Sequence, residues 1–369
     1  MRLAAIVNVL FGAGASALAA SAGVLPWDFA ASGFEQALAP REFVFPRDHG
    51  PHPSFAHEWW YLTGHLEAAN GERFGFELTF FRVGLAAAAP ERATGASRWR
   101  ARQIFVAHFA VTEIGRQQFH SAERYARDAL ALSGAQSDPP RVWLDDCSLE
   151  LSGATWQMKA RQPGYALELA MTPALAPVLN GTAGLSQKSD NPADASYYYS
   201  VPRLSVTGRL VRNAESVAVH GTAWLDREWG SGALAADETG WDWFALQFAD
   251  GSDLMFYALR RRDGTRDSHS AGTWVDAKGQ ARTLASADVR IGVLGSWDSP
   301  RGGRYPARWR IDIASLGLAV DLHPLVANQE LSGRPRYWEG AVEVAGARGK
   351  QPVAGEGYVE LVGYASAPR

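Results

Sequence analysis

The feature that most constrains the fold is a pattern of aromatic, alternating segments separated by glycine turns. Residues 57–83 contain two such segments around an Asn-Gly pair at 70–71, and residues 240–265 contain two more around an Asp-Gly pair at 250–251. Because these pairs accept the positive φ of a tight turn, each region is expected to form a β-hairpin. Helical periodicity is scarce, although residues 121–132 could form a short helix. We therefore predict an all-β fold of antiparallel barrels or sandwiches.

The length of the chain indicates more than one domain. A chain of 369 residues exceeds the size at which a single hydrophobic core is usual. Arg2 is followed by an apolar run that ends in small residues, which is typical of a secretory signal peptide, with a retained membrane helix as the alternative. We place the signal peptide at residues 1–22, a linker at 23–40, an N-terminal domain at 41–231 and a C-terminal domain at 232–369. The expected location is therefore secreted or periplasmic.

Charge and motif searches exclude several kinds of site. A net charge of −3 gives no electrostatic reason to expect a nucleic-acid partner, and a single cysteine, Cys147, excludes an intramolecular disulfide and cysteine-ligated zinc. The zinc-protease motif fails because Tyr61 stands where the second histidine is required, and no P-loop, dinucleotide fingerprint or G-x-S-x-G elbow occurs. We expect no metal and no cofactor. No role is assigned to four histidines: His49, His52, His57 and His65.

One short segment, HGTAWLDREWG at 220–230, concentrates the candidate chemistry. Because alternate residues of a strand share a face, one face of this segment carries His220, Thr222, Trp224, Asp226 and Glu228. Such a face fits a polar-bottomed pocket with aromatic walls. The alternative is a structural network in which Asp226 or Glu228 pairs with Arg203 or Arg227.

Aromatic residues elsewhere are candidates for the walls of this pocket. Tyr197 and Tyr199 share a face of the segment SYYYS and could donate hydrogen bonds or stabilise a cation, or could simply pack in a core. Glu58 could line a site or be buried against an arginine. We predict as ligand-binding residues His220, Glu228, Glu58, Trp60, Trp241 and Trp243.

Six longer motifs resemble those of the AttH-like proteins and carotenoid 1,2-hydratases. They are EWWYLTG (58–64), ASYYYSVPRLSVTG (195–208), GTAWLDREWGS (221–231), GWDWFALQFADG (240–251), YWEGAV (337–342) and GEGYVELVGY (355–364). The resemblance extends from about residue 41 to the C-terminus. It implies two tandem lipocalin-like (calycin) antiparallel β-barrel domains.

The resemblance also implies a chemistry. The hydratases add water across a terminal carotene double bond: an aspartate protonates the alkene, aromatic groups stabilise the cation, and water adds to it. By motif the aspartate falls on Asp226 and its aromatic neighbour on Trp224, where the hydratases have a tyrosine. Their upstream histidine and tryptophan fall near Tyr197 and Tyr199, and Glu228 stands where they have an asparagine.

Three functions are carried forward from these observations. The first is a hydratase-like enzyme acting on an apolar polyene, isoprenoid or lipid, with Asp226 as general acid. The second is a non-catalytic periplasmic carrier of such a ligand that works beside a membrane export system. The third is a secreted hydrolase, which the absent nucleophile elbow and metal motif disfavour.

Overall fold

The computed structural model describes residues 33–87, 101–232 and 234–365. The predicted signal peptide, 1–22, and residues 23–32 of the predicted linker lie outside this part of the chain. The described residues form β-strands joined by turns and loops, with only three short 3-10 helices: η2 (Arg47–His49), η3 (Ser286–Asp288) and η4 (Ala314–Leu316). The prediction of an all-β fold is confirmed.

No helix among the described residues is long and apolar enough to cross a membrane.

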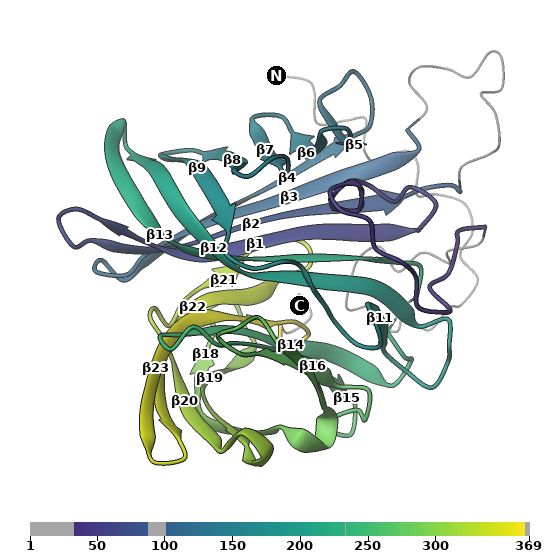
Figure 1. The fold of residues 1–369 in the computed structure, drawn as a ribbon. Coiled ribbons are helices and arrows are strands. Elements are labelled where there is room, and N and C mark those ends of the chain that lie inside the picture. Colours follow the sequence, from purple (N-terminus) through teal and green to yellow (C-terminus); the bar gives the residue numbers. More distant parts are fainter. Residues whose placement is uncertain (1–32, 88–100, 233, 366–369) are drawn as a thin grey trace.

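A 13-stranded antiparallel sheet forms the N-terminal half, with the strand order β4-β3-β2-β1-β13-β12-β9-β8-β7-β6-β5, and with β10 and β11 paired to β12. It folds over on itself, so that β5–β9 cover β1–β4 in Figure 1. Its strands are β1 (His57–Ala68), β2 (Arg73–Gly84), β3 (Gln103–Glu113), β4 (Gln118–Arg127), β5 (Ser133–Ser137), β6 (Pro140–Leu144), β7 (Cys147–Glu150), β8 (Trp156–Gln162), β9 (Tyr165–Pro173), β10 (Val178–Leu179), β11 (Leu185–Gln187), β12 (Ala195–Arg212) and β13 (Glu215–Gly230).

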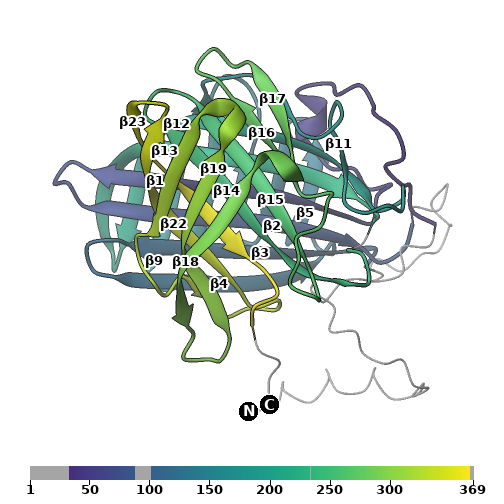
Figure 2. The same cartoon turned by 90° about the horizontal axis from the view of Figure 1, so that it is seen from below.

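A second, 10-stranded antiparallel sheet curls into a barrel below the first, with the order β17-β16-β15-β14-β23-β22-β20-β19-β18 and β21 paired to β22 (Figures 1 and 2). The predicted boundary between residues 231 and 232 falls between β13 and β14. The strands are β14 (Glu238–Phe248), β15 (Asp253–Arg261), β16 (Ala271–Val275), β17 (Ala281–Ala285), β18 (Arg290–Asp298), β19 (Arg304–Ile313), β20 (Leu318–Pro324), β21 (Glu330–Leu331), β22 (Tyr337–Arg348) and β23 (Gln351–Leu361).

Both predicted hairpins form, while the predicted helix does not. Gly71 and Gly251 have φ values of 82° and 86° and turn the chain between β1 and β2 and between β14 and β15. Residues 121–132 instead lie largely in β4, which pairs with β3 along its whole length. Pairing with a neighbouring strand outweighs the weak helical pattern of this segment, since its local preference is worth little against long-range contacts.

Three separate hydrophobic clusters explain how the sheets stack. One fills the interior of the first sheet and includes Trp60 and Trp229, and a second fills the interior of the barrel and includes Trp309. The third lies between the outer faces of the two sheets and is rich in aromatic residues. The barrel interiors are therefore packed cores, and the contact between the halves is itself aromatic.

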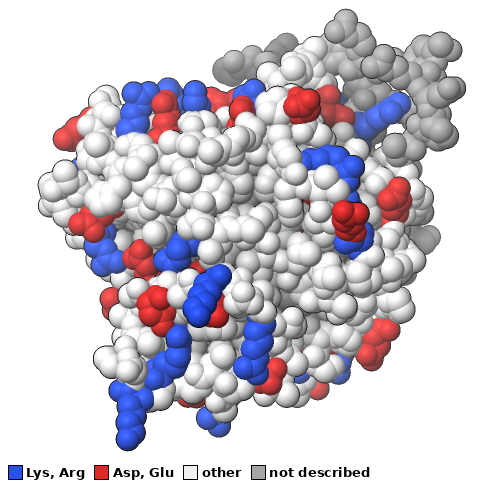
Figure 3. Space-filling model, viewed as in Figure 1, with Lys and Arg blue, Asp and Glu red and all other residues white. Residues whose placement is uncertain are grey.

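On the face shown in Figure 3, basic and acidic residues are interspersed, and no large patch of one sign is visible.

Candidate functional site

A cavity of about 160 Å³ opens within the aromatic contact between the two sheets. For scale, an apolar cavity of about 150 Å³ is large enough to bind benzene. Its lining is mostly apolar, and both sheets contribute aromatic side chains, namely Trp59, Tyr61, Phe81, Tyr198, Trp241, Trp243, Tyr257 and Tyr337. Apolar walls that surround a few polar groups are typical of a small-molecule site.

Strand register explains why these residues meet. Asp226 on β13 lies opposite Tyr61 on β1 and Ser200 on β12, and Glu228 lies opposite Trp59 and Tyr198. Directly opposite residues in a ladder share a face, so these side chains form two adjacent rows on the outside of the first sheet. The alternation expected for residues 220–230 thus places Trp224, Asp226 and Glu228 toward the second sheet.

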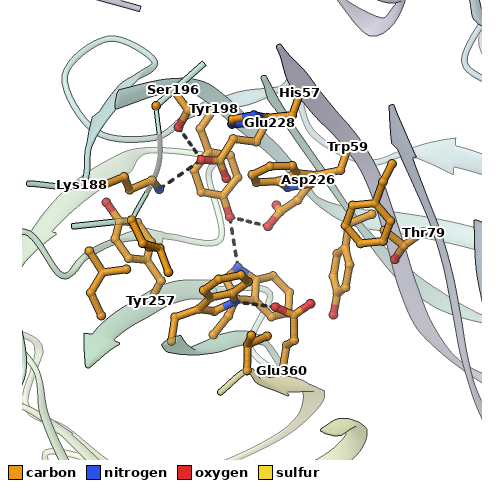
Figure 4. Close-up of a pocket in the computed structure, with 18 of the residues that line it drawn as sticks. His57, Trp59, Thr79, Lys188, Ser196, Tyr198, Asp226, Glu228, Tyr257 and Glu360 are labelled. Atoms are coloured by element: carbon orange, nitrogen blue, oxygen red, sulfur yellow. Dashed lines mark hydrogen bonds and ion pairs between the residues drawn. The ribbon is translucent and has the colours of Figure 1, made fainter. Parts of the chain in front are cut away.

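Asp226 is a buried acid held by neutral donors. Its Oδ1 accepts hydrogen bonds from Ser200 Oγ at 2.5 Å and Trp224 Nε1 at 2.7 Å, and the Tyr198 hydroxyl donates to Oδ2 (Figure 4). No lysine or arginine of the described chain forms an ion pair with it. Burial raises the pKa of Asp226 to about 7; hydrogen bonds from the three donors lower it, and the charge of Glu228 raises it. A large fraction of this carboxyl group is therefore protonated near neutral pH.

A chain of hydrogen bonds fixes which oxygen of Asp226 carries the proton. Thr273 on β16 donates to Asn180 Oδ1 at 2.8 Å, and Asn180 Nδ2 donates to Ser200 Oγ at 2.9 Å. Ser200 must then donate its own proton to Oδ1 of the acid. Since Oδ1 also accepts from Trp224, the acidic proton belongs on Oδ2, beside the Tyr198 hydroxyl. The second barrel thereby orients an acid that the first sheet carries.

Glu228 is neutralised by a lysine. Lys188, on the segment between β11 and β12, lies 3.2 Å from Glu228, and Ser196 also donates to this carboxylate (Figure 4). The ammonium group lies 4.0 Å from the ring centroid of Tyr257. Burial lowers the pKa of Lys188, but the electrostatic interactions with Glu228 and Tyr257, and the hydrogen bonds of these residues to the ammonium group, together outweigh burial, so that the pKa is raised and the lysine stays protonated.

Two further buried acids lie near Asp226, Glu360 from the second sheet and Glu77 from the first, and neither was predicted from the sequence. Glu360 on β23 lines the cavity, and Trp241 Nε1 donates to its Oε1 at 2.5 Å. Burial raises the pKa of Glu360 to about 7, and that of the nearby Glu77 on β2 to about 8. The only sequence signal for Glu360 is an acidic residue inside the otherwise apolar run GYVELVGY.

The structure brings part of the predicted site together. Asp226, Glu228, Trp241 and Trp243 line the cavity, and Trp224 is buried beside Asp226 as its hydrogen-bond donor. His220 lies exposed, opposite Glu67 and Thr207, far along β13 from Asp226.

Tyr197 and Tyr199 are not part of the cavity, contrary to their predicted role. Both rings point into the first core, where they contact Phe43 and Trp229. The intervening Tyr198 faces the cavity and donates to Asp226. A shift of one residue along a strand exchanges its two faces, so matching the motif by position selected the wrong tyrosines.

Glu58 and Trp60 also belong to the first core and not to the cavity. Glu58 forms ion pairs with Arg82 and, at 3.1 Å, with Arg227, all three being 0% exposed. The Arg227 guanidinium lies 3.8 Å from the ring centroid of Trp60. Arg227 is therefore committed to Glu58, which corrects the alternative in which it pairs with Asp226 or Glu228. For Glu58, the structure shows the alternative in which this residue is buried against an arginine and does not line a site.

The histidines have separate environments. His52 stacks on Trp229 at 3.7 Å, His49 Nδ1 lies 2.6 Å from the Tyr199 hydroxyl, and His65 Nε2 lies 2.9 Å from the Gly357 carbonyl oxygen. His57 lines the cavity. Within the described residues, no group of three or more His, Cys, Asp or Glu side chains is arranged to hold a metal ion.

The buried acids predict how stability depends on pH. Asp226, Glu360 and Glu77 have folded-state pKa values of about 7, 7 and 8, above their ordinary values. The folded state therefore binds more protons than the unfolded state, and stability is lost as pH rises through these values. Burial lowers the pKa values of His49 and His57 to about 4, so these histidines make stability rise with pH. Their effect ends at about pH 6.5, the ordinary pKa of histidine, and does not offset the loss above it.

We expect the free energy of unfolding to fall by about 1–3 kcal/mol between pH 6.5 and 8. Urea unfolding followed by tryptophan fluorescence measures this. The Asp226→Asn variant should show a shallower fall, because it cannot ionise. A free energy that rises over this range would contradict the assignment.

Comparisons with known proteins agree with this architecture. The sequence model of the AttH-like family matches residues 36–364. A crystal structure of an AttH protein from Nitrosomonas europaea is 33% identical, with a TM-score of 0.79, covering 89% of this chain and 100% of that one. No curated protein matches the sequence.

Two more distant structures share the fold. Kievitone hydratase from Nectria haematococca is 16% identical, with a TM-score of 0.68, covering 92% of this chain and 99% of that one. The protein CghA is 13% identical, with a TM-score of 0.54, covering 92% and 98%. The prediction of two tandem lipocalin-like barrels is confirmed.

Proposed function

Because the chain belongs to the AttH-like family and has a hydratase-like lipocalin fold, we propose that it adds water across a carbon–carbon double bond of an apolar isoprenoid or polyene. The observation that carries this proposal is Asp226: a buried carboxyl group in an aromatic cavity, with a pKa raised to about 7 and no cationic partner among the described residues. A carboxyl group with a pKa near the working pH is suited to donate a proton.

The proposed reaction begins with Asp226. Its Oδ2 proton moves to one alkene carbon, the π electrons form the new C–H bond, and a tertiary cation remains on the other carbon. The cation is stabilised by the π electrons of three lining residues, Trp59, Trp243 and Tyr198. Each cation–π contact contributes about 1–2 kcal/mol when it is desolvated. The oxygen of a water molecule then bonds to the cation, and the water loses a proton. The product is the alkene plus one water.

A carrier is the second candidate, because the same apolar lining could bind a lipid without changing it. In that case Asp226 would only anchor the ligand. For both functions we propose export, since the apolar N-terminal segment supports it, and a membrane export system is a further proposed partner of the carrier.

A hydrolase has less support. Ser186 Oγ lies 3.0 Å from Lys188 Nζ, a spacing that serine–lysine hydrolases use. However, Glu228 holds Lys188 in its protonated state, so Lys188 cannot accept the proton of the serine hydroxyl. The pair therefore lacks its base.

Mass spectrometry of organic extracts from purified protein tests the proposal, with wild type compared with Asp226→Asn. An isoprenoid that carries one added water in the wild type, and is unmodified in the variant, would support the hydratase. The same unmodified lipid in both would favour the carrier. Extracts without any apolar ligand would count against both.

A further inference from the structure

Buried polar atoms without partners lie at and beside one wall of the cavity, where Thr79 lines it and Glu77 and Glu339 are close to lining residues. Within the described part of the chain, both carboxylate oxygens of Glu77 and the hydroxyl of Thr79 have no hydrogen-bond partner, although these residues are at most 1% exposed. Oε2 of the buried Glu339 has no donor either, but its carboxyl group lies within hydrogen-bonding reach of Glu360. The Thr79 hydroxyl lies close enough to lower the pKa of Glu77 somewhat, but it does not form a hydrogen bond of normal geometry with it. Buried polar atoms of this kind usually contact an ordered water.

These atoms lie together because of how the strands pair. Thr79 lies opposite Tyr61 on β1, and Glu339 lies opposite Glu360 on β23. Tyr61 joins the two sheets, since its hydroxyl donates to Glu339 Oε1 at 2.5 Å. Thr79, Tyr61 and Glu360 line the cavity, and Figure 4 shows Thr79 and Glu360 facing it from the two sheets.

The chemistry of this wall favours water over a cation. Burial raises the pKa of Glu77 to about 8 and that of Glu339 well above its usual value, so these two acids are largely protonated and carry little of the charge that a cation needs. Glu360, whose pKa is raised to about 7, is ionised in a substantial fraction of molecules near neutral pH. The described residues also offer no metal-holding group. A water needs two to four polar partners, and the unpartnered oxygen atoms supply them.

We propose that Thr79, Glu77 and Glu339 hold the water that is added to the substrate, and that Glu360 accepts its proton. This inference rests on the proposed hydratase function. As the water oxygen bonds to the cation, one O–H bond breaks, its electron pair stays on the oxygen, and the proton moves to the Glu360 carboxylate. The acid thus comes from the first sheet and the base from the second.

The electrostatic interaction between Asp226 and Glu360 fits the roles of acid and base that are proposed for them. Ionised Asp226 disfavours ionisation of Glu360, so the pair favours states with one proton between them. Before the reaction that proton is on Asp226, and afterwards it is on Glu360. The cycle closes when the proton returns to Asp226.

The first test is structural. A high-resolution crystal structure of the protein without ligand should show an ordered water within hydrogen-bonding distance of Thr79 Oγ and a carboxyl oxygen of Glu77 or Glu339. The Thr79→Val variant, which keeps the shape of the side chain, should lose it. A site without water, or one occupied by a metal ion, would overturn the proposal.

The second test separates protonation from water addition, with geraniol in D₂O as the probe. The Glu360→Gln variant should hydrate geraniol about 10²-fold more slowly and still incorporate deuterium into recovered geraniol, because Asp226 can protonate the alkene and take the proton back. Asp226→Asn should do neither. Glu343→Gln, which removes an exposed carboxylate from β22, is the matched control and should behave as wild type.

The outcomes distinguish the two proposals. Normal hydration by Glu360→Gln, or parallel loss of hydration and exchange, would overturn the role of Glu360. A wild type that neither hydrates geraniol nor exchanges deuterium would count against the hydratase function for this class of alkene, while the crystallographic water would still decide whether the water site exists.

Discussion

Replacing Asp226 with asparagine is expected to slow hydration by about 10²–10⁴-fold while leaving ligand affinity intact. Asparagine keeps the shape of the protonated acid, and its oxygen can still accept from Ser200 and Trp224. Its amide nitrogen replaces the oxygen that accepts from Tyr198, so the Tyr198 hydroxyl must turn to accept from the amide. The transferable proton is lost, while the shape of the cavity is kept. Product formation from geraniol, measured by gas chromatography–mass spectrometry, and quenching of tryptophan fluorescence by the ligand, measure the two effects separately.

A suitable control for this variant is Asp237→Asn, which removes a carboxylate that is 59% exposed. It should leave both turnover and affinity unchanged. An Asp226→Asn variant with wild-type turnover would exclude Asp226 as the acid. If instead the variant lost binding and turnover together, Asp226 would be an anchor for the ligand, as in a carrier.

The Glu58→Gln variant is expected to lose about 3–5 kcal/mol of stability, because it breaks a buried ion-pair network. The substitution leaves the guanidinium groups of Arg82 and Arg227 buried without their carboxylate. Glutamine can still accept a hydrogen bond, so the loss reports mainly the missing charge. Urea unfolding at pH 7 measures the change, and no direct effect on the cavity is expected, because Glu58 lies on the opposite face of β1.

Glu168→Gln is the matched control for that experiment. Glu168 pairs with Arg209 at 2.7 Å, but the two side chains are 38% and 57% exposed, and the pair should contribute no more than about 1 kcal/mol. If the two substitutions lowered the free energy of unfolding equally, the large contribution expected of the Glu58 network could not be due to its burial.

The fold could be predicted from the sequence because its signals are local. Hairpin turns at Asn70-Gly71 and Asp250-Gly251 and alternating aromatic residues depend on neighbours in the chain. The same alternation placed Asp226 and Glu228 on one face. It could not show which residues of other strands share that face, since this depends on register.

Register accounts for the residues that were misplaced or missed. Tyr198 faces Asp226, while its neighbours Tyr197 and Tyr199 face the core, a difference of one position. Glu360 comes from a strand more than 130 residues later in the chain, and only the packing of two sheets brings it to the cavity. Sequence spacing carries no information about a contact of that kind.

The filled interiors of both barrels have a consequence for how this protein can change. Many lipocalins hold their ligands inside the barrel, so that altering specificity there disturbs the core. Here the aromatic cores are separate from the cavity, which lies between two outer faces. A combinatorial library confined to cavity residues such as Phe81, Trp241 and Leu259 should therefore yield folded variants with new ligand preferences. This scaffold is a favourable starting point for directed evolution.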